Sequence, residues 1–195
     1  MDRVESQLIE KCQRGDVRAF DELVRRYERQ VYNFAFKMTA NREDAYDVAQ
    51  DALVRVYHFI DTFKAQSSFT TWLYRIVLNA YLDSRKKSKI RDQSVSLDEY
   101  LEQEDGYGPK QVADEDTPAP EELVLATERT EVLHAAIGLL PDYQRAMIVF
   151  YHVNHMSYEE IAEILSLPIG TVKSRLNRAR QALKEKLSES KELFS

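Results

Sequence analysis

The segment 157–180, SYEEIAEILSLPIGTVKSRLNRAR, constrains the fold of this chain more than any other stretch. Ser157 and Glu160 form an S-x-x-E capping box, which satisfies orphan amides at the start of a helix. Pro168 and Gly170 then interrupt the chain before a second helix. Apolar residues recur at helical spacing in both halves, at Tyr158, Ile161, Ala162 and Leu165 and then at Val172, Leu176, Ala179 and Leu183. The pattern predicts a helix-turn-helix.

The second helix of this motif also has a polar face. Lys173, Ser174, Asn177 and Arg178 are suited to base edges, and Arg175 and Arg180 flank them toward phosphates. Basic groups gather on this side, which favours a DNA-reading helix. The alternative is a merely solvated face, because helix-turn-helix hairpins also occur in proteins that never touch DNA.

The rest of the chain also has a helical pattern. With five glycines, five prolines and no run of alternating strand pattern, the sequence predicts an all-α fold. Gly15 ends a short first helix and Asp16 caps the second, whose apolar face follows the i, i+3, i+4, i+7 rule from Phe20 to Met38. In the second half of the chain a helix ends at Pro141, and Asp142 is predicted to cap the next one.

A third helix, capped by Asn41, has an unusual exposed side. Its inward positions are Ala45, Val48, Ala49, Leu53, Val56 and Ile60. Its outward positions form a mostly acidic strip of Asp44, Asp47, Gln50 and Asp51, with Arg55 one turn beyond. Acids in the first turn complement the helix macrodipole, which explains Asp44 but explains Asp51 poorly. A basic partner surface is the second interpretation of this strip.

A fourth helix begins at Phe69 after the polar loop 61–68 and runs into a basic segment. Its apolar stripe is Phe69, Trp72, Leu73, Ile76, Val77, Ala80 and Tyr81. Off this stripe lie Thr71, Tyr74, Arg75 and Asn79, and the basic residues Arg85, Lys86, Lys87, Lys89 and Arg91 follow. Aromatic and amide groups beside cations suit a groove for single-stranded nucleic acid. Phe69 and Trp72 themselves are predicted to belong to the core.

The helical periodicity stops at residue 93, where acidic residues, glycines and prolines take over. The sequence therefore predicts two small helical domains, 1–92 and 122–195, joined by a flexible acidic linker, 93–121. The simplest interpretation of these acids is a solvated spacer. Because they lie between two basic surfaces, the alternatives are that they repel DNA or mimic a nucleic-acid backbone.

Composition and missing motifs exclude several classes of function. A net charge of −6 argues against coating of nucleic acid by bulk electrostatics. One cysteine, Cys12, leaves no disulfide framework, and no signal peptide or membrane span is present, so a cytoplasmic protein is expected. His152 and His155 lack a third metal ligand, and no P-loop, nucleotide-binding glycine motif or G-x-S-x-G occurs. No catalytic residue, metal or cofactor is predicted, and the chain is not expected to be an enzyme.

Four segments in order carry a resemblance to a known family: GDVRAFDELVRRY, EDAYDVAQDALVRVYHFIDTF, SFTTWLYRIVLNAYLD and the stretch from LPDYQRAMIVF through SRLNRARQAL. The chain resembles bacterial sigma factors of the extracytoplasmic-function group, in the sigma-70 family. The match covers nearly the whole length and implies region two in the first domain and region four in the second. It implies a subunit that binds core RNA polymerase and directs promoter recognition and transcription initiation.

The resemblance assigns roles to residues of this chain. Polymerase binding falls to Asp47, Gln50, Asp51 and Arg55. Recognition and melting of the minus-ten element, with capture of an extruded non-template base, falls to Phe63, Lys64, Ser67, Tyr74, Arg75, Asn79, Arg85 and Lys86. The minus-thirty-five duplex would meet Lys173, Ser174, Asn177 and Arg178 at bases and Thr171, Arg175 and Arg180 at phosphates. Partners implied are core polymerase, promoter DNA and an anti-sigma factor.

Two positions depart from the family pattern. Phe150, Tyr151 and His152 stand where many members have an arginine before the Ser-Tyr-Glu-Glu motif. Asp83 replaces an amide or basic residue, and a carboxylate there would repel phosphate. The alternative function is a helix-turn-helix transcriptional regulator that acts without being a polymerase subunit, with the first domain as a dimerisation or sensor module.

Overall fold

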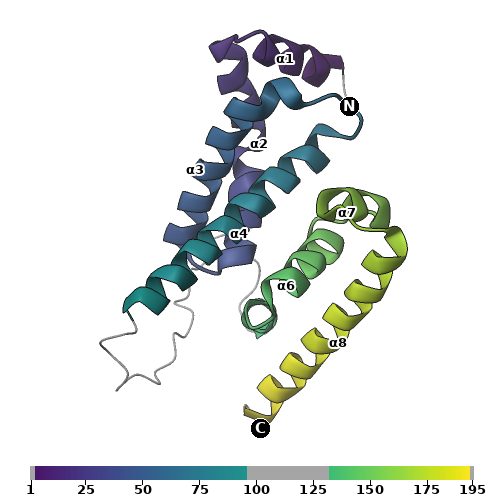
Figure 1. Cartoon of the computed structure of the whole chain (residues 1–195). Coiled ribbons are helices and arrows are strands. Elements are labelled where there is room, and N and C mark those ends of the chain that lie inside the picture. Colours follow the sequence, from purple (N-terminus) through teal and green to yellow (C-terminus); the bar gives the residue numbers. More distant parts are fainter. Residues whose placement is uncertain (1–2, 96–131, 194–195) are drawn as a thin grey trace, which may run out of the picture.

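The computed structural model describes residues 3–95 and 132–193, and within them every regular element is a helix (Figure 1). The first part comprises α1 (Arg3–Gln13), α2 (Val17–Thr39), α3 (Arg42–Phe59), the 3₁₀ turn η1 (Ile60–Thr62) and α4 (Phe69–Val95). The second part comprises a helix over 132–138, then α6 (Asp142–Ile148), the π-helical turn η2 (Val149–Val153), α7 (Tyr158–Leu165) and α8 (Ile169–Leu193). The predicted all-α fold is confirmed for these residues, and none of their helices is long and apolar enough to cross a bilayer.

Local signals define the helix ends of the first part as predicted. Gly15 adopts φ +84°, a left-handed conformation that glycine tolerates best, directly after α1. The Asp16 side chain accepts hydrogen bonds from the Arg18 and Ala19 amides at the start of α2. Asn41 does the same at the start of α3, where it accepts from the amides of residues 43 and 44. Each cap satisfies amides that have no partner within the helix.

The apolar faces predicted for α2, α3 and α4 pack against one another. From α2 the core receives Leu23, Val31, Phe34, Ala35 and Met38, and from α3 it receives Ala45, Val48, Ala49, Ala52 and Val56. From α4 it receives Phe69, Leu73, Val77, Ala80 and Tyr81. Burial of one such large side chain contributes about 1.5–3 kcal/mol. The helical spacing of these residues is therefore what sets the mutual orientation of the three helices.

The helix-turn-helix forms as predicted, with one shift at its turn. The capping box is present, because the Glu160 amide donates to Ser157 Oγ at 3.1 Å and the Ser157 amide donates to Glu160 Oε2 at 2.9 Å. Ser166, at φ 52°, ends α7 in a left-handed conformation. α8 already begins at Ile169, ahead of Thr171, and the carbonyl of Pro168 accepts from the Thr171 amide at 2.9 Å. Proline directly before a helix and glycine within its first turn are both tolerated there.

One predicted cap is wrong. Pro141, and not Asp142, occupies the N-cap of α6, and no side chain caps this helix. Asp142 lies in the first turn, where its carboxylate accepts a hydrogen bond from the Tyr81 hydroxyl of α4. Burial raises the pKa of the Tyr81 phenol, and the hydrogen bond to Asp142 acts in the same direction, so the hydroxyl stays protonated and donates. The carboxylate therefore joins the two halves of the chain.

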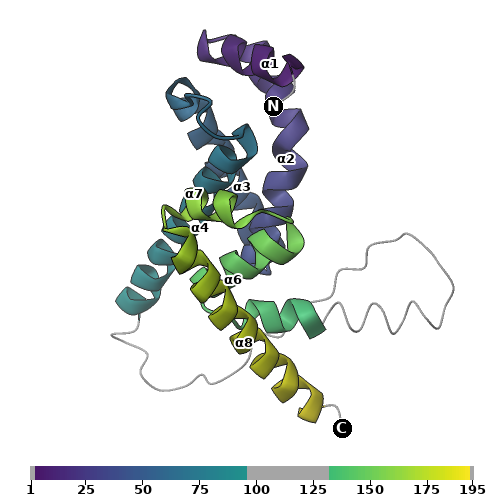
Figure 2. The same ribbon diagram turned by 90° about the vertical axis from the view of Figure 1, so that its right-hand side faces the viewer.

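Within the described residues, buried side chains of the two halves form one continuous core. The ring of Phe150 stacks on Phe34 of α2 at 4.9 Å between centroids and meets Tyr74 of α4 edge-on at 5.9 Å. Arg145 of α6 is only 8% exposed and donates to the Met38 carbonyl of α2. Figures 1 and 2 show the result, with α6 and α7 between α4 and α8.

The predicted linker falls almost entirely outside the described residues. α4 continues to Val95, past the predicted domain end at residue 92. The acidic segment 96–121 is not among the residues that the structure describes.

Candidate nucleic-acid interface

The polar face of α8 is open along the predicted recognition surface. Val172, Leu176 and Ala179 are buried against the second part of the chain, which turns the intervening positions outward. Lys173, Ser174, Arg175, Asn177 and Arg178 are exposed, while Thr171 and Arg180 are half-buried. Ser174 Oγ donates to the Thr171 carbonyl at 3.0 Å, so its hydroxyl proton is used within the helix. The sequence thus predicted correctly which side of this helix faces away from the core.

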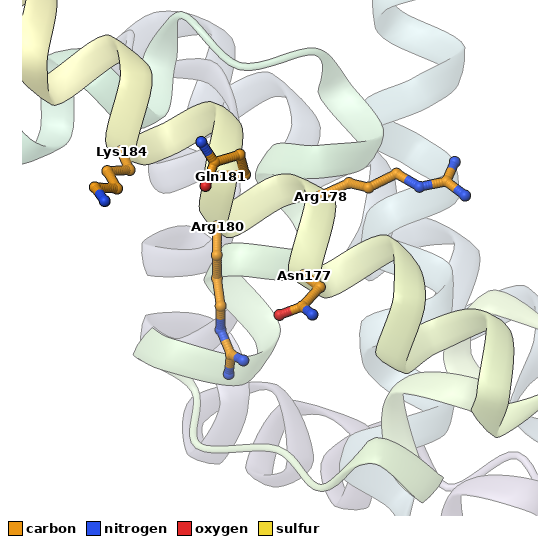
Figure 3. Close-up of a pocket in the computed structure, with 5 residues that line it drawn as sticks. All are labelled: Asn177, Arg178, Arg180, Gln181 and Lys184. Atoms are coloured by element: carbon orange, nitrogen blue, oxygen red, sulfur yellow. The ribbon is translucent and has the colours of Figure 1, made fainter.

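An open hollow lies on the same side of α8 (Figure 3). It is lined by Asn177, Arg178, Arg180, Gln181 and Lys184. In the close-up, Arg178 and Arg180 extend away from the ribbon in different directions, with Asn177 between them (Figure 3). Gln181 and Lys184 were missed in the sequence, although they stand four and seven positions after Asn177 and so continue its face. The polar surface therefore extends about one helical turn beyond the predicted set.

Three cations of α8 rest on tyrosine rings from the preceding elements. Lys173 Nζ lies 5.5 Å from the ring centroid of Tyr158, and Arg175 Cζ lies 5.1 Å from that of Tyr143. Arg180 Cζ lies 4.8 Å from the ring centroid of Tyr151. These distances are within the range of cation–π attraction. These contacts hold the three cationic side chains against the protein surface.

Arg178 and Asn177 differ from these cations. Within the described residues, neither makes an intramolecular hydrogen bond or ion pair, and neither lies over an aromatic ring. A guanidinium carries five N–H donors, and an amide offers both donors and an acceptor. These two side chains therefore keep their full hydrogen-bonding capacity for an external partner.

The predicted single-strand surface on α4 is largely covered. The sequence indicates that Thr71 and Tyr74 lie off the apolar stripe, but Thr71 is 1% exposed and Tyr74 is 7% exposed. Tyr74 packs between Phe34 and Phe150, so the second part of the chain supplies the burial. Arg75 donates to the Glu163 carbonyl of α7. In this arrangement neither the Tyr74 ring nor the Arg75 guanidinium is free to meet a base.

The remaining residues of that surface are mixed in exposure. Asn79, Arg85, Lys86 and the loop residue Lys64 are exposed, and Ser67 is half-buried. Phe63 is buried against Phe69 and Trp72, with centroids 5.5 and 5.4 Å away. Arg85 Nε lies 3.8 Å from a carboxylate oxygen of Asp142, so one basic residue of this surface already faces the second part. Basic and amide groups thus remain open at the far end of α4, whereas the aromatic groups are closed off.

The acidic strip on α3 is exposed and contains an ion-pair cluster. Arg55 donates to Asp51 at 2.8 Å and to Asp83 of α4 at 2.6 Å. The charge of Asp83, for which the sequence predicts phosphate repulsion, is therefore matched by Arg55. Asp47 and Gln50 are exposed beside this cluster. Sequence reasoning missed a set of exposed apolar side chains on the same helix, namely Tyr46, Val54 and Tyr57.

His152 and His155 are not part of a metal site in the described residues, where no group of three or more potential ligands gathers. His152 instead accepts a hydrogen bond from Arg180 Nε at 3.0 Å. Burial lowers the pKa of His152, and the nearby charge of Arg180 lowers it further, which favours the neutral acceptor form.

Two family models match this chain, one on each half. The sigma-70 region 2 model covers residues 23–90, and the sigma-70 region 4 model covers residues 130–183. Together they span more than half of the sequence, in the order that the resemblance implies. The chain belongs to the sigma-70 family.

Relatives place this sigma factor in the extracytoplasmic-function group. It is 35% identical to the ECF RNA polymerase sigma factor SigW of Bacillus subtilis over 92% of this chain and 94% of that protein. A solved structure of CnrH in complex with the cytosolic domain of CnrY matches 93% of this chain and 96% of its own, at 26% identity and a TM-score of 0.62. The Bartonella quintana sigma factor RpoE, solved in complex with the anti-sigma factor NepR, matches 87% of this chain and 96% of its own, at 26% identity and the same score.

Both family models include the surfaces described above. Region 2 contains α3 and most of α4, and region 4 contains the helix-turn-helix. Sigma factors are promoter-recognition subunits of RNA polymerase and are generally not enzymes. Membership in this family supports a sigma factor over a helix-turn-helix regulator that works apart from the polymerase.

Proposed function

We propose that this sigma factor reads the minus-thirty-five element with α8 and opens the minus-ten element with α4 and the loop 61–68, while α3 binds core RNA polymerase. The observation that carries the proposal is the open polar face of α8 in a chain that matches both sigma regions. The protein itself catalyses no reaction in this role. It acts in the cytoplasm, where bacterial RNA polymerase works.

The residues of α8 divide into two groups in this proposal. Arg178 and Asn177 contact bases, because both are exposed and keep all their hydrogen-bonding groups. Lys173 and Ser174 lie beside them on the same helix face and are also assigned to bases. Arg175, Arg180 and Thr171 contact phosphates, since two of the three are held on tyrosine rings at the flank of the helix.

The minus-ten role of α4 requires the two halves of the chain to separate. Asn79, Arg85, Lys86 and Lys64 are available to a phosphate backbone in the closed arrangement, but Tyr74 is not. The interface has a built-in weakness, because Arg75 Nε is buried without a hydrogen-bond partner. An unpaired buried donor of a charged group costs about 1–3 kcal/mol or more. Separation would relieve this cost and release Tyr74 to stack on a base, as aromatic side chains do with single strands.

The outer surface of α3 has the character of a protein interface. Asp47, Gln50 and Asp51 provide polar contacts, and the exposed rings of Tyr46 and Tyr57 provide apolar area. Arg55 holds Asp51 in position through their ion pair. Core polymerase is the partner we assign to this surface. Because RpoE of Bartonella quintana was solved with an anti-sigma factor, we extend that kind of partner to this chain.

Reconstituted transcription tests the proposal directly. The full chain is mixed with core polymerase and a template library with randomised upstream sequence, and transcripts are sequenced. We expect transcription only when both proteins are present, with two separated sequence elements enriched upstream of the start sites. Binding to duplex DNA without any stimulation of core polymerase would instead support a regulator that acts apart from the enzyme.

A further inference from the structure

Arg180 is held by two groups that come from one short segment of the chain. η2, the π-helical turn Val149–Val153, presents Tyr151 and His152 side by side to α8. The guanidinium carbon of Arg180 lies 4.8 Å from the Tyr151 ring centroid, and its Nε donates to His152 Nε2 at 3.0 Å. In the sequence, a loop and the whole of α7 separate Tyr151 and His152 from Arg180. The helical spacing of α8 therefore does not predict either contact.

The hydrogen bond to His152 uses one particular donor of Arg180. A guanidinium has five N–H groups in a fixed fork, and the Nε group is the one directed along the side of that fork. With Nε taken by His152, the four donors on the two Nη atoms remain for a second partner. That pair of atoms matches the spacing of two phosphate oxygens. Figure 3 shows the Arg180 side chain extending away from the α8 ribbon beside the hollow.

The tyrosine beneath Arg180 is itself fixed in place. Tyr151 stacks on Tyr158 of α7 with centroids 5.1 Å apart and an interplanar angle of 27°. Tyr158 in turn lies under Lys173. A continuous aromatic surface therefore supports the cations at both ends of the predicted contact face, whereas Arg178 between them has no such support. The neutral form of His152, which the lowered pKa favours, suits its role as acceptor.

We propose that Tyr151 and His152 are positioning residues that preset Arg180 to grip a DNA phosphate beside the minus-thirty-five element. This inference rests on the proposed function of α8. A long side chain that is ordered before binding loses less rotamer freedom when it binds. The segment 150–152 lacks the arginine that many family members have there. It thus supports a phosphate contact indirectly, because it holds Arg180 of the recognition helix.

The test measures binding of the full chain to a short mixed-sequence DNA duplex over a series of salt concentrations. Arg180→Ala is expected to reduce the slope of log affinity against log salt by about one, the value for one lost phosphate contact. His152→Ala is expected to weaken binding about two- to tenfold, because Arg180 must then be ordered during binding. His152→Gln retains an acceptor oxygen and is expected to bind within twofold of the wild type.

The decisive measurement is the double variant. If His152 acts through Arg180, His152→Ala has no further effect when Arg180→Ala is already present. The matched control is Arg14→Ala, which should leave binding unchanged. Arg14 is an exposed arginine of α1 that is ion-paired with Glu10. Tyr151→Leu, checked for folding by circular dichroism, should weaken binding in the same non-additive way.

Additive losses in the double variant, or wild-type binding by His152→Ala, would overturn the inference while leaving the proposed function intact. An unchanged salt slope in Arg180→Ala would overturn it as well. A wild-type chain that binds no duplex at all at low salt would count against the proposed function of α8 and against this inference together.

Discussion

The α8 face and the α4 face are both assigned to nucleic acid, yet only one of them is open. On α8 the polar side chains point to solvent while its apolar side contacts the rest of the second part. On α4 the central aromatic and basic groups, Tyr74 and Arg75, contact that same second part. The proposed duplex face is thus exposed, and the central groups of the proposed single-strand face are covered. A chain arranged in this way can meet a duplex before it exposes the groups that bind a separated strand.

Loss of the Phe150 side chain should have the largest effect on the difference in exposure between the α8 and α4 faces. It is fully buried between Phe34 and Tyr74, so Phe150→Ala is expected to lower the free energy of unfolding by about 3–5 kcal/mol. It should also uncover Tyr74 and increase affinity for mixed-sequence single-stranded DNA, with no matching increase in duplex binding by α8. Urea unfolding and fluorescence anisotropy with the two kinds of DNA measure these effects.

Two further variants keep this prediction interpretable. Phe150→Leu should show the same increase with a smaller loss of stability, because it keeps most of the apolar volume. Phe20→Ala removes a ring that packs edge-on against Tyr57 within the first part and so serves as the control. If Phe20→Ala raises single-strand binding as much as Phe150→Leu does, general loosening and not the release of the α4 face is the cause.

Asp51→Arg tests a third surface, the acidic strip of α3. This strip lies in the first part of the chain, as the α4 face does, but it is exposed. The substitution replaces the partner of Arg55 with a like charge and presents that charge to the polymerase. We expect it to weaken assembly with core polymerase by about 2–5 kcal/mol, measured by titration of labelled protein. Asp44→Arg is the matched control, since Asp44 lies in the first turn of α3 and mainly complements the helix dipole. Equal losses in both variants would contradict the assignment.

Arg178→Ala tests the open face itself. Because Arg178 is exposed and lacks an intramolecular partner in the described residues, we assign it to a base. Its loss should cost about 1–3 kcal/mol and relax sequence preference at one position. Arg175→Ala should instead weaken binding to all sequences alike, because Arg175 lies over Tyr143 at the flank. Sequencing of duplexes selected by the reconstituted holoenzyme distinguishes the two outcomes.

Local features of this fold were predictable from the sequence. The Asp16 and Asn41 caps and the Ser157–Glu160 capping box depend on residues within three positions of each other, and all three form. The buried side of α8 follows from helical spacing alone. The same spacing predicts which positions of α8 are exposed, so the sequence identifies most of the candidate duplex face.

Contacts between distant segments could not be predicted in this way. Periodicity assigns Tyr74 to a face of α4 but cannot say that Phe150 will cover that face. Likewise, Asp83 and Arg55 lie 28 positions apart, and nothing in the spacing of either helix indicates their ion pair. The hydrogen bond from Arg145 to the Met38 carbonyl spans 107 positions. The Arg55–Asp83 pair arises from packing of α3 on α4, whereas the Arg145 bond and the cover over Tyr74 arise from packing between the two halves. The second of these explains why Tyr74 is buried although its spacing on α4 predicts an open position.

The smallest expected effect is a pH dependence of the contact between the two halves of the chain. His134, on the helix 132–138, has its pKa lowered by burial and then by the charge of Lys37 on α2. The neutral form is therefore favoured in the closed protein, so this residue supports closure above about pH 6.5, the ordinary value for histidine. That support is lost as the pH falls through the lowered pKa, because a proton then places a second cation near Lys37. Single-strand binding should thus rise slightly between pH 7.5 and about pH 5.5. His134→Gln should abolish the part of that rise due to His134, and an identical pH profile in wild type and variant would show that this contact does not respond to this histidine.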